Sequence, residues 1–260
     1  MLVVLAWTSL AFCGEIHDAV QHGDLEKIKA LLKSDPNLIN DVNDNNHLWT
    51  PLHWAADVGN KDAVALLLAY GADVNVRERW FHWTPLILAA KKGRADVVAL
   101  LLSSNADVNA QGTEGGTALH FAAEIGDTNV AKILLANKTD INAKERLDGK
   151  TPLHIAANKG QTNMVELLLA NKADVNATDG SGWTPLHWAA ESNWASDSDY
   201  IVVAKILLAH KAKINARAEG SAGRPTPMYF AIREGHKEMA AFLLLHGGLD
   251  LYSIGDGGGP

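Results

Sequence analysis

Cysteine is nearly absent from this sequence, since Cys13 is the single one among 260 residues. One cysteine excludes an intramolecular disulfide and a cysteine-rich zinc site. The chain also lacks an excess of positive charge, because 30 acidic residues outnumber 23 basic ones and give a net charge of -7. Proteins that wrap nucleic acid need a basic surface, so this balance argues against that class. With 47% hydrophobic and 20% charged residues, the composition is that of a folded soluble protein.

Familiar catalytic motifs are missing as well. The sequence contains no Gly-x-Ser-x-Gly elbow, no phosphate loop ending in Gly-Lys-Ser/Thr and no His-Glu-x-x-His pair. The glycine-rich stretches 180–182 and 255–259 are expected to be a turn and a tail, because neither lies between a strand and a helix. We therefore predict a protein that is not an enzyme and needs no cofactor. An enzyme built from scattered polar residues stays open as an alternative.

The first thirteen residues form an uncharged, largely apolar run. The run is shorter than the about 20 residues of a membrane-spanning helix, but its length fits the apolar core of a signal peptide. Small residues at the peptidase positions of Ala11-Phe12-Cys13 predict cleavage before Gly14 and a secreted or periplasmic protein. Three alternatives stay open: a lipid anchor at Cys13, since Leu10–Cys13 resembles a lipobox, an apolar strap on the first helices, and a cytoplasmic chain.

The rest of the chain is dominated by one recurring phrase. Its common form is Thr-Pro-Leu-His-x-Ala-Ala, followed by a glycine, then a leucine run and then Asp-Val-Asn or a variant. Threonine before proline predicts the capped start of a helix, the glycine its left-handed end, and the leucine run a second helix. Two short helices cannot bury their apolar faces alone, so the copies must stack. The copies begin, at steps of 33 or 34 residues, at Thr50, Thr84, Thr117, Thr151 and Thr184, with a degenerate last copy at Thr226.

This pattern resembles the ankyrin repeat family over roughly residues 15 to 252. The resemblance implies an all-α solenoid of about seven stacked helix-turn-helix repeats with projecting β-turn fingers. It also implies binding of other proteins through a concave groove and the finger tips. We place the repeat domain at 14–252, between the leader 1–13 and a flexible glycine-rich tail at 253–260. The repeats are expected at about 14–44, 45–78, 79–111, 112–145, 146–179, 180–219 and 220–252.

The last two repeats depart from the pattern. The step from Thr184 to Thr226 is 42 residues, so about eight residues are inserted. Alignment places six of them between the two helices, within residues 193–200, and the rest in the turn 217–225; we expect both insertions to be surface loops. The final helix contains the apolar run 239–245. Three explanations stay open for this run: the tail covers it, the chain is a fragment of a longer repeat array, or a second copy of the chain packs on it. We expect a monomer unless that helix self-associates.

Four histidines recur at the repeat period, which raises the question of a metal site. Helices of adjacent repeats lie about 8–10 Å apart, whereas the ligands of one zinc ion each lie about 2 Å from it. We therefore predict no metal, and a hydrogen bond from each histidine to the turn backbone. The four are His53, His120, His154 and His187.

One finger has an unusual composition. Trp80, Phe81 and His82 stand where other fingers carry polar residues or glycine, and arginines lie beside them. Exposed aromatics next to arginine are typical of binding hot spots, although folding onto the neighbouring finger is an equal alternative. The short basic run favours an acidic protein partner over nucleic acid. The predicted partner-binding residues are Arg77, Arg79, Trp80, Phe81, His82, Trp83, Lys91 and Lys92, with His47, Glu114 and Asp148 on neighbouring tips, and Trp194 and Tyr200 in the insertion as a second candidate.

Overall fold

The computed structural model describes residues 14–42, 48–193, 195–220 and 223–250. The predicted leader 1–13, the tail 253–260, His47 and Trp194 lie outside the described residues. The chain divides into an N-terminal unit, Met1–Phe121 with Ala136–Thr139, and a C-terminal unit, Ala122–Leu135 with Asp140–Pro260.

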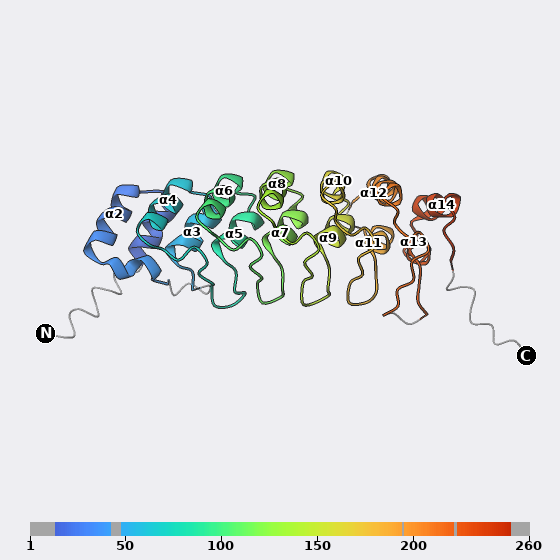
Figure 1. The fold of residues 1–260 in the computed structure, drawn as a ribbon, viewed down its shortest axis with the longest axis horizontal. Helices are drawn as coiled ribbons and strands as arrows, with labels where there is room; N and C mark the ends of the chain where they lie inside the picture. The colour runs from blue at the N-terminus through green and yellow to red at the C-terminus, as the bar shows by residue number, and fades with distance from the viewer. Residues whose placement is uncertain (1–13, 43–47, 194, 221–222, 251–260) are drawn as a thin grey trace, which may run out of the picture. The chain divides into compact units, whose positions relative to one another are not determined.

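The N-terminal unit consists of short helices that pack in series. Residues 14–22 are helical, and α2 (Leu25–Ser34) and the 3-10 helix η1 (Pro36–Asn40) follow. The next pairs are α3 (Pro51–Val58) with α4 (Lys61–Ala69), and α5 (Pro85–Lys91) with α6 (Ala95–Ser103); α7 (Ala118–Ile125) begins in this unit. Helix α3 packs on α4 and α5, and α4 packs on α6. The loops between successive pairs project from one edge as fingers (Figure 1).

The C-terminal unit continues the same alternation. It contains α8 (Thr128–Ala136), α9 (Pro152–Asn158), α10 (Thr162–Ala170), α11 (Pro185–Glu191), α12 (Asp197–Ala209), α13 (Pro227–Arg233) and α14 (Lys237–Leu245). Helices α9, α11 and α13 pack in one series, and α10, α12 and α14 in another. No strand occurs among the described residues of either unit. The all-α, repeat-based fold class expected from the sequence is confirmed, while the exact repeat boundaries stay a prediction.

The recurring phrase makes the helix start that its residues predict. Thr50 and Thr151 are N-caps with extended backbone, and each is followed by a proline in the first turn. At the other end of α3, Gly59 has φ 84, a left-handed conformation that a side chain would strain. A Cβ atom there would also lie 2.7 Å from Cδ of Arg94. The short first helix of the repeat therefore begins and ends where the sequence indicates.

The periodic histidines are structural, as expected. Nδ1 of His154 accepts the backbone N–H of Thr151 at 3.1 Å, and Nε2 donates to the carbonyl of Trp183 in the next repeat at 3.0 Å. His53 makes the same pair of bonds within the N-terminal unit, and His187 does so within the C-terminal unit. Burial lowers the pKa of each of these three imidazoles to about 4, so the neutral ring ties neighbouring repeats together.

The insertion at 193–200 was expected to be a loop, and for residues 197–200 this expectation is wrong. Helix α12 has 13 residues where α10 has 9, because Ser196 forms a capping box with Asp199 and starts the helix early. Tyr200 lies in this added turn and is 2% exposed; its hydroxyl donates to the carbonyl of Asn158 at 2.9 Å. Tyr200 is therefore a packing residue and not part of a partner-binding surface.

The last helix has one buried and one open face. Met239 and Leu243 are buried, whereas Leu244 and Leu245 are 60% and 87% exposed. Ile232 and Leu249 add exposed apolar surface in the same repeat. The described residues thus leave an apolar face at this repeat, as the sequence indicated.

Candidate functional site

The unusual finger, residues 77–83 and named the Trp80 finger from here on, is built around one buried carboxylate. Glu78 is 1% exposed, and its backbone N–H donates to the carbonyl of Trp83 at 3.0 Å, which closes the finger. Its Oε2 accepts the N–H of Trp80 at 2.8 Å. Its Oε1 accepts the N–H groups of Phe81 at 2.5 Å and Trp83 at 3.1 Å. Three tip amides are thereby fixed by one side chain that does not reach the surface.

The tip presents two aromatic side chains to solvent. Trp80 is 59% exposed and Phe81 is 39% exposed, and both are large apolar groups. His82 follows with φ 53, a left-handed conformation that glycine adopts in three other fingers, at Gly115, Gly149 and Gly182. A residue with a side chain is strained in this conformation by about 1 kcal/mol. The finger therefore combines an exposed aromatic pair with a backbone strain that it shares with Leu48 and Arg224 at the same position of two other repeats.

The base of the finger forms a stack of aromatic rings and one cation. The rings of Phe81 and Trp83 stack with centroids 4.6 Å apart, and the edge of Trp83 meets Phe121 at 5.6 Å. Nζ of Lys91 lies 4.2 Å from the centroid of Trp83 and 5.0 Å from that of Phe121. Trp83 and Lys91 thus hold the finger to its helices, while Trp80 stays outside the stack.

The neighbouring finger supports the Trp80 finger from one side. The N–H of Thr113 donates to the carbonyl of Phe81 at 2.7 Å, and Nη1 of Arg77 donates to the carbonyl of Gln111 at the same distance. Gly112 allows this close approach, because a Cβ atom there would lie 2.8 Å from Trp83 and 2.9 Å from the carbonyl oxygen of Phe81. These contacts make the Trp80 finger a braced, preformed surface.

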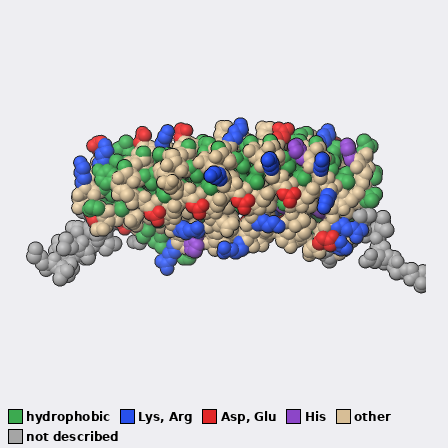
Figure 2. Space-filling model, viewed as in Figure 1, with side chains coloured by type: hydrophobic (Ala, Val, Ile, Leu, Met, Phe, Trp, Pro, Cys, Tyr) green, Lys and Arg blue, Asp and Glu red, His purple; other side chains and the backbone are tan. Residues whose placement is uncertain are grey.

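Basic side chains surround the exposed aromatics. Arg77, Arg79 and His82 are exposed, and Figure 2 shows basic, His and hydrophobic side chains together at the finger edge of this unit. Lys92 points elsewhere, since its Nζ lies 3.4 Å from Oδ1 of Asp57. Glu114 is exposed on the neighbouring tip.

Asp148, also predicted as a contact residue, belongs to a finger of the C-terminal unit. Its carboxylate accepts from Nζ of Lys150 at 2.8 Å, and its backbone carbonyl accepts the N–H of Gly180 at 2.7 Å. The charge of Asp148 is thus paired within its own finger. The structure brings Arg77, Arg79 and the residues from Trp80 to Trp83 together, with Lys91 at the base.

Sequence reasoning missed three residues that shape this site: Glu78, Gly112 and Phe121. A signal for Glu78 exists, because Glu78 and Glu145 both stand six residues before the repeat threonine, and the backbone N–H of each closes its finger. That recurrence predicts a role inside the finger. The close contact at Gly112 has no such signal, since it depends on how two fingers meet.

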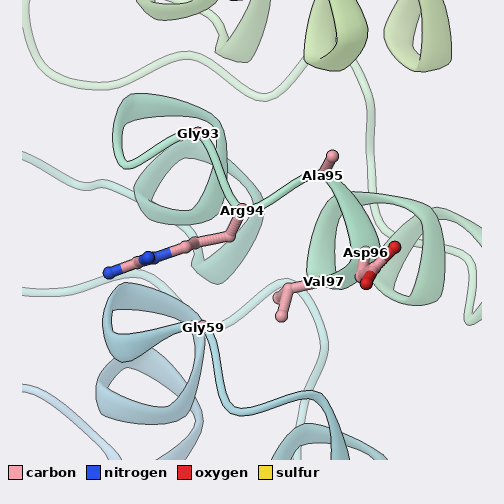
Figure 3. A pocket seen from close by; sticks show the side chains of 6 residues that line it. All are labelled: Gly59, Gly93, Arg94, Ala95, Asp96 and Val97. Atoms are coloured by element: carbon pink, nitrogen blue, oxygen red, sulfur yellow. The ribbon is translucent and has the colours of Figure 1, made fainter.

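A second candidate site is a cavity lined by residues of the repeat helices and their turns. This shallow cavity of about 310 Å³ is lined by Gly59, Gly93, Arg94, Ala95, Asp96 and Val97. Figure 3 shows that the side chains of Arg94 and Asp96 point in opposite directions, and Nε of Arg94 donates to the carbonyl of Asp57 at 3.1 Å. Its polar side chains therefore do not converge on a common point.

Among the described residues, no cluster of three His, Cys, Asp or Glu side chains is arranged to bind a metal ion. In the same part of the chain, every helix is too short or too polar to cross a bilayer.

Comparison with known proteins gives one consistent result. The sequence model described as "Ankyrin repeats (3 copies)" matches residues 16–112, 77–145, 100–179, 119–218 and 178–253, and these matches overlap across most of the chain. Ankyrin repeat domain-containing protein 13C-B from Xenopus laevis is 40% identical over 62 residues. That similarity covers 24% of this chain and 11% of the Xenopus protein, so it extends over a small part of that relative.

Proposed function

The chain belongs to the ankyrin repeat family, and we propose that it is a non-catalytic protein-binding module whose main contact surface is the Trp80 finger. Ankyrin repeats form binding scaffolds, so binding a protein follows from the family, and the location is what the residues add. The observation that carries the proposal is the pair Trp80 and Phe81, 59% and 39% exposed on a braced finger.

Exposed aromatic side chains on a rigid support are a favourable basis for binding. Tryptophan and arginine dominate the energetics of protein interfaces, because they bury large surfaces and make directed contacts. The amides of the Trp80 finger are already held by Glu78, so little conformational entropy remains to be lost on association. We therefore expect binding by a preformed surface with little backbone rearrangement.

Affinity capture from native extract tests the location. The immobilised full chain is compared with the double variant Trp80→Ser/Phe81→Ser and with Leu147→Ser, which changes the equivalent residue of a C-terminal finger. We expect one partner to be retained by the wild type and Leu147→Ser and lost by the double variant, with equal circular dichroism for all three. A partner captured equally by all three proteins places the contact surface elsewhere. Specific capture by none of them removes the binding proposal.

A second candidate function is self-assembly through the last repeat. Leu244 and Leu245 are 60% and 87% exposed on α14, and burying them between two copies removes apolar surface from water. Sedimentation velocity at micromolar concentration tests this: a mass above the monomer that Leu244→Lys/Leu245→Lys abolishes supports assembly. A wild-type monomer over the whole concentration range rejects it.

We also propose that the chain is exported to the periplasm or the cell exterior. Support comes from the uncharged apolar residues 1–13, which lie outside the described residues, and from the small residues before Gly14. Fractionation of the expressing cells with mass spectrometry of the mature N-terminus tests this. A mature chain that begins at Gly14 supports cleavage, lipid on Cys13 supports an anchor, and an intact Met1 in the cytoplasm rejects export.

A further inference from the structure

We infer that the Trp80 finger recognises an acidic segment of its partner, with an apolar side chain of that segment packed on Trp80. This inference rests on the function proposed above and specifies the chemistry of the partner.

The Trp80 finger exposes positive charge and buries its one carboxylate. Arg79 is exposed and makes no hydrogen bond or ion pair within the described residues. Arg77 uses one N–H on the carbonyl of Gln111, a neutral acceptor, and so keeps its charge. Glu78 is buried, and its two oxygens are occupied by three backbone amides. A chain of net charge -7 therefore presents two exposed guanidinium groups beside Trp80, while the negative charge of Glu78 lies buried beneath them.

The acidic groups nearest in sequence are engaged elsewhere or stand apart. Asp73 accepts the N–H of Asn75 at 2.9 Å, and Asp107 accepts the N–H of Asn109 at 3.0 Å, so both carboxylates cap their own turns. Glu114 is the exposed acid on the neighbouring tip. On the two tips themselves one exposed acid, Glu114, stands against two exposed arginines, whereas Asp73 and Asp107 are exposed in turns outside the tips; the tip of the Trp80 finger is therefore basic.

An equivalent finger within the same chain shows what is specific to this one. Residues 145–150 correspond in length to residues 78–83 and have the same closing bond, from the N–H of Glu145 to the carbonyl of Lys150 at 3.0 Å. In that finger the position of Phe81 is taken by Asp148, which pairs with Lys150. The Trp80 finger thus has the aromatic residues Phe81 and Trp83 at the positions where its counterpart has the ion pair of Asp148 and Lys150.

Single-stranded nucleic acid fits the surroundings of the Trp80 finger less well than an acidic protein segment does. Single-stranded nucleic acid is bound along a continuous basic groove that follows its backbone. The repeats flanking the finger carry Asp73, Asp107 and Glu114 on their exposed turns, which interrupts any such groove in this unit. A short acidic segment of a protein needs only the finger itself.

A random peptide library displayed on yeast tests the inference with the full chain as the labelled probe. We expect the enriched peptides to combine two or more Asp or Glu residues with an apolar residue. Binding of a synthetic enriched peptide should weaken at least about tenfold in Arg77→Glu/Arg79→Glu, because two exposed ion pairs become repulsions. The matched variant Arg146→Glu, in the equivalent finger, should bind like the wild type. Circular dichroism confirms that each variant is folded.

The outcomes separate this inference from the proposed function. Peptides whose binding requires Trp80 and Phe81 but that carry no excess of acidic residues overturn the inference of an acidic partner segment. The proposal that the Trp80 finger is the contact surface then still holds. Peptides that bind Trp80→Ser/Phe81→Ser as well as the wild type, or a library without enrichment, overturn both. If a polyuridine oligonucleotide competes with the peptide for the wild type, and Arg77→Glu/Arg79→Glu no longer binds the oligonucleotide, the finger binds nucleic acid. That result overturns the inference of a protein segment.

Discussion

Acid should destabilise this protein through its buried histidines. The pKa of His53, His154 and His187 falls from 6.5 to about 4 in the folded chain, mainly because burial disfavours the charged ring. A lowered folded pKa means that the unfolded chain binds protons first, so stability is complete above about pH 6.5 and is lost as the pH falls towards about 4. Between about pH 7 and pH 5 each ring costs about 2 kcal/mol, and the three together about 6 kcal/mol.

Urea unfolding followed by circular dichroism at the two pH values measures this loss. The chain supplies its own replacement, because Ile87 occupies the histidine position in one repeat and is fully buried there. His154→Ile should therefore lower the pH dependence of the unfolding free energy by about 2 kcal/mol, whatever its effect at neutral pH. Ile87→His, the reciprocal change, should increase it. Equal pH dependence in the wild type and His154→Ile would refute the reasoning.

The Trp80 finger gives three further predictions. Glu78→Gln should lower the unfolding free energy by about 1–3 kcal/mol, because the tip amides lose a charged acceptor. The same substitution should speed the hydrogen exchange of residues 80–83, which mass spectrometry measures. His82→Gly should instead raise the thermal midpoint, because it relieves a left-handed side chain worth about 1 kcal/mol; a lower midpoint would contradict the strain. Gly112→Ala should cost about 1–3 kcal/mol in urea unfolding, because its Cβ atom meets Trp83 and Phe81 at 2.8 and 2.9 Å; unchanged stability would show that the finger shifts freely.

Local signals in the sequence were sufficient to predict the fold. Each threonine N-cap, first-turn proline and left-handed glycine acts within a few residues, so the start and end of a helix are readable without knowledge of the tertiary structure. The role of the histidines was also predictable, because a residue that recurs at the repeat period must make the same contact in each repeat. Where one local signal was overlooked, the prediction was wrong. Ser196 and Asp199 form a capping box, so the segment that was predicted to be a loop forms the first turn of α12, which contains Tyr200.

The candidate site was only partly predictable, because its geometry depends on contacts between fingers. The sequence singles out Trp80 and Phe81 by contrast with other repeats, but it does not show that Trp83 is taken into a stack with Lys91 while Trp80 stays exposed. The close approach that Gly112 permits is likewise a property of two chain segments far apart in sequence. Side-chain exposure at a loop tip is set by such packing and not by composition.

In each finger, the residues that hold the backbone conformation differ from the residues that are exposed at the tip. In two fingers an acidic side chain accepts tip amides: Glu78 accepts those of Trp80, Phe81 and Trp83, and Asp179 accepts those of Ser181 and Trp183, although the tip residues differ. A recurring support with a variable tip lets recognition change at little cost in stability, because tip side chains make few contacts within the fold. Substitutions of Trp80 should accordingly change binding alone, whereas substitutions of Glu78 should change binding and stability together. That difference distinguishes a contact residue from a positioning residue in the same finger.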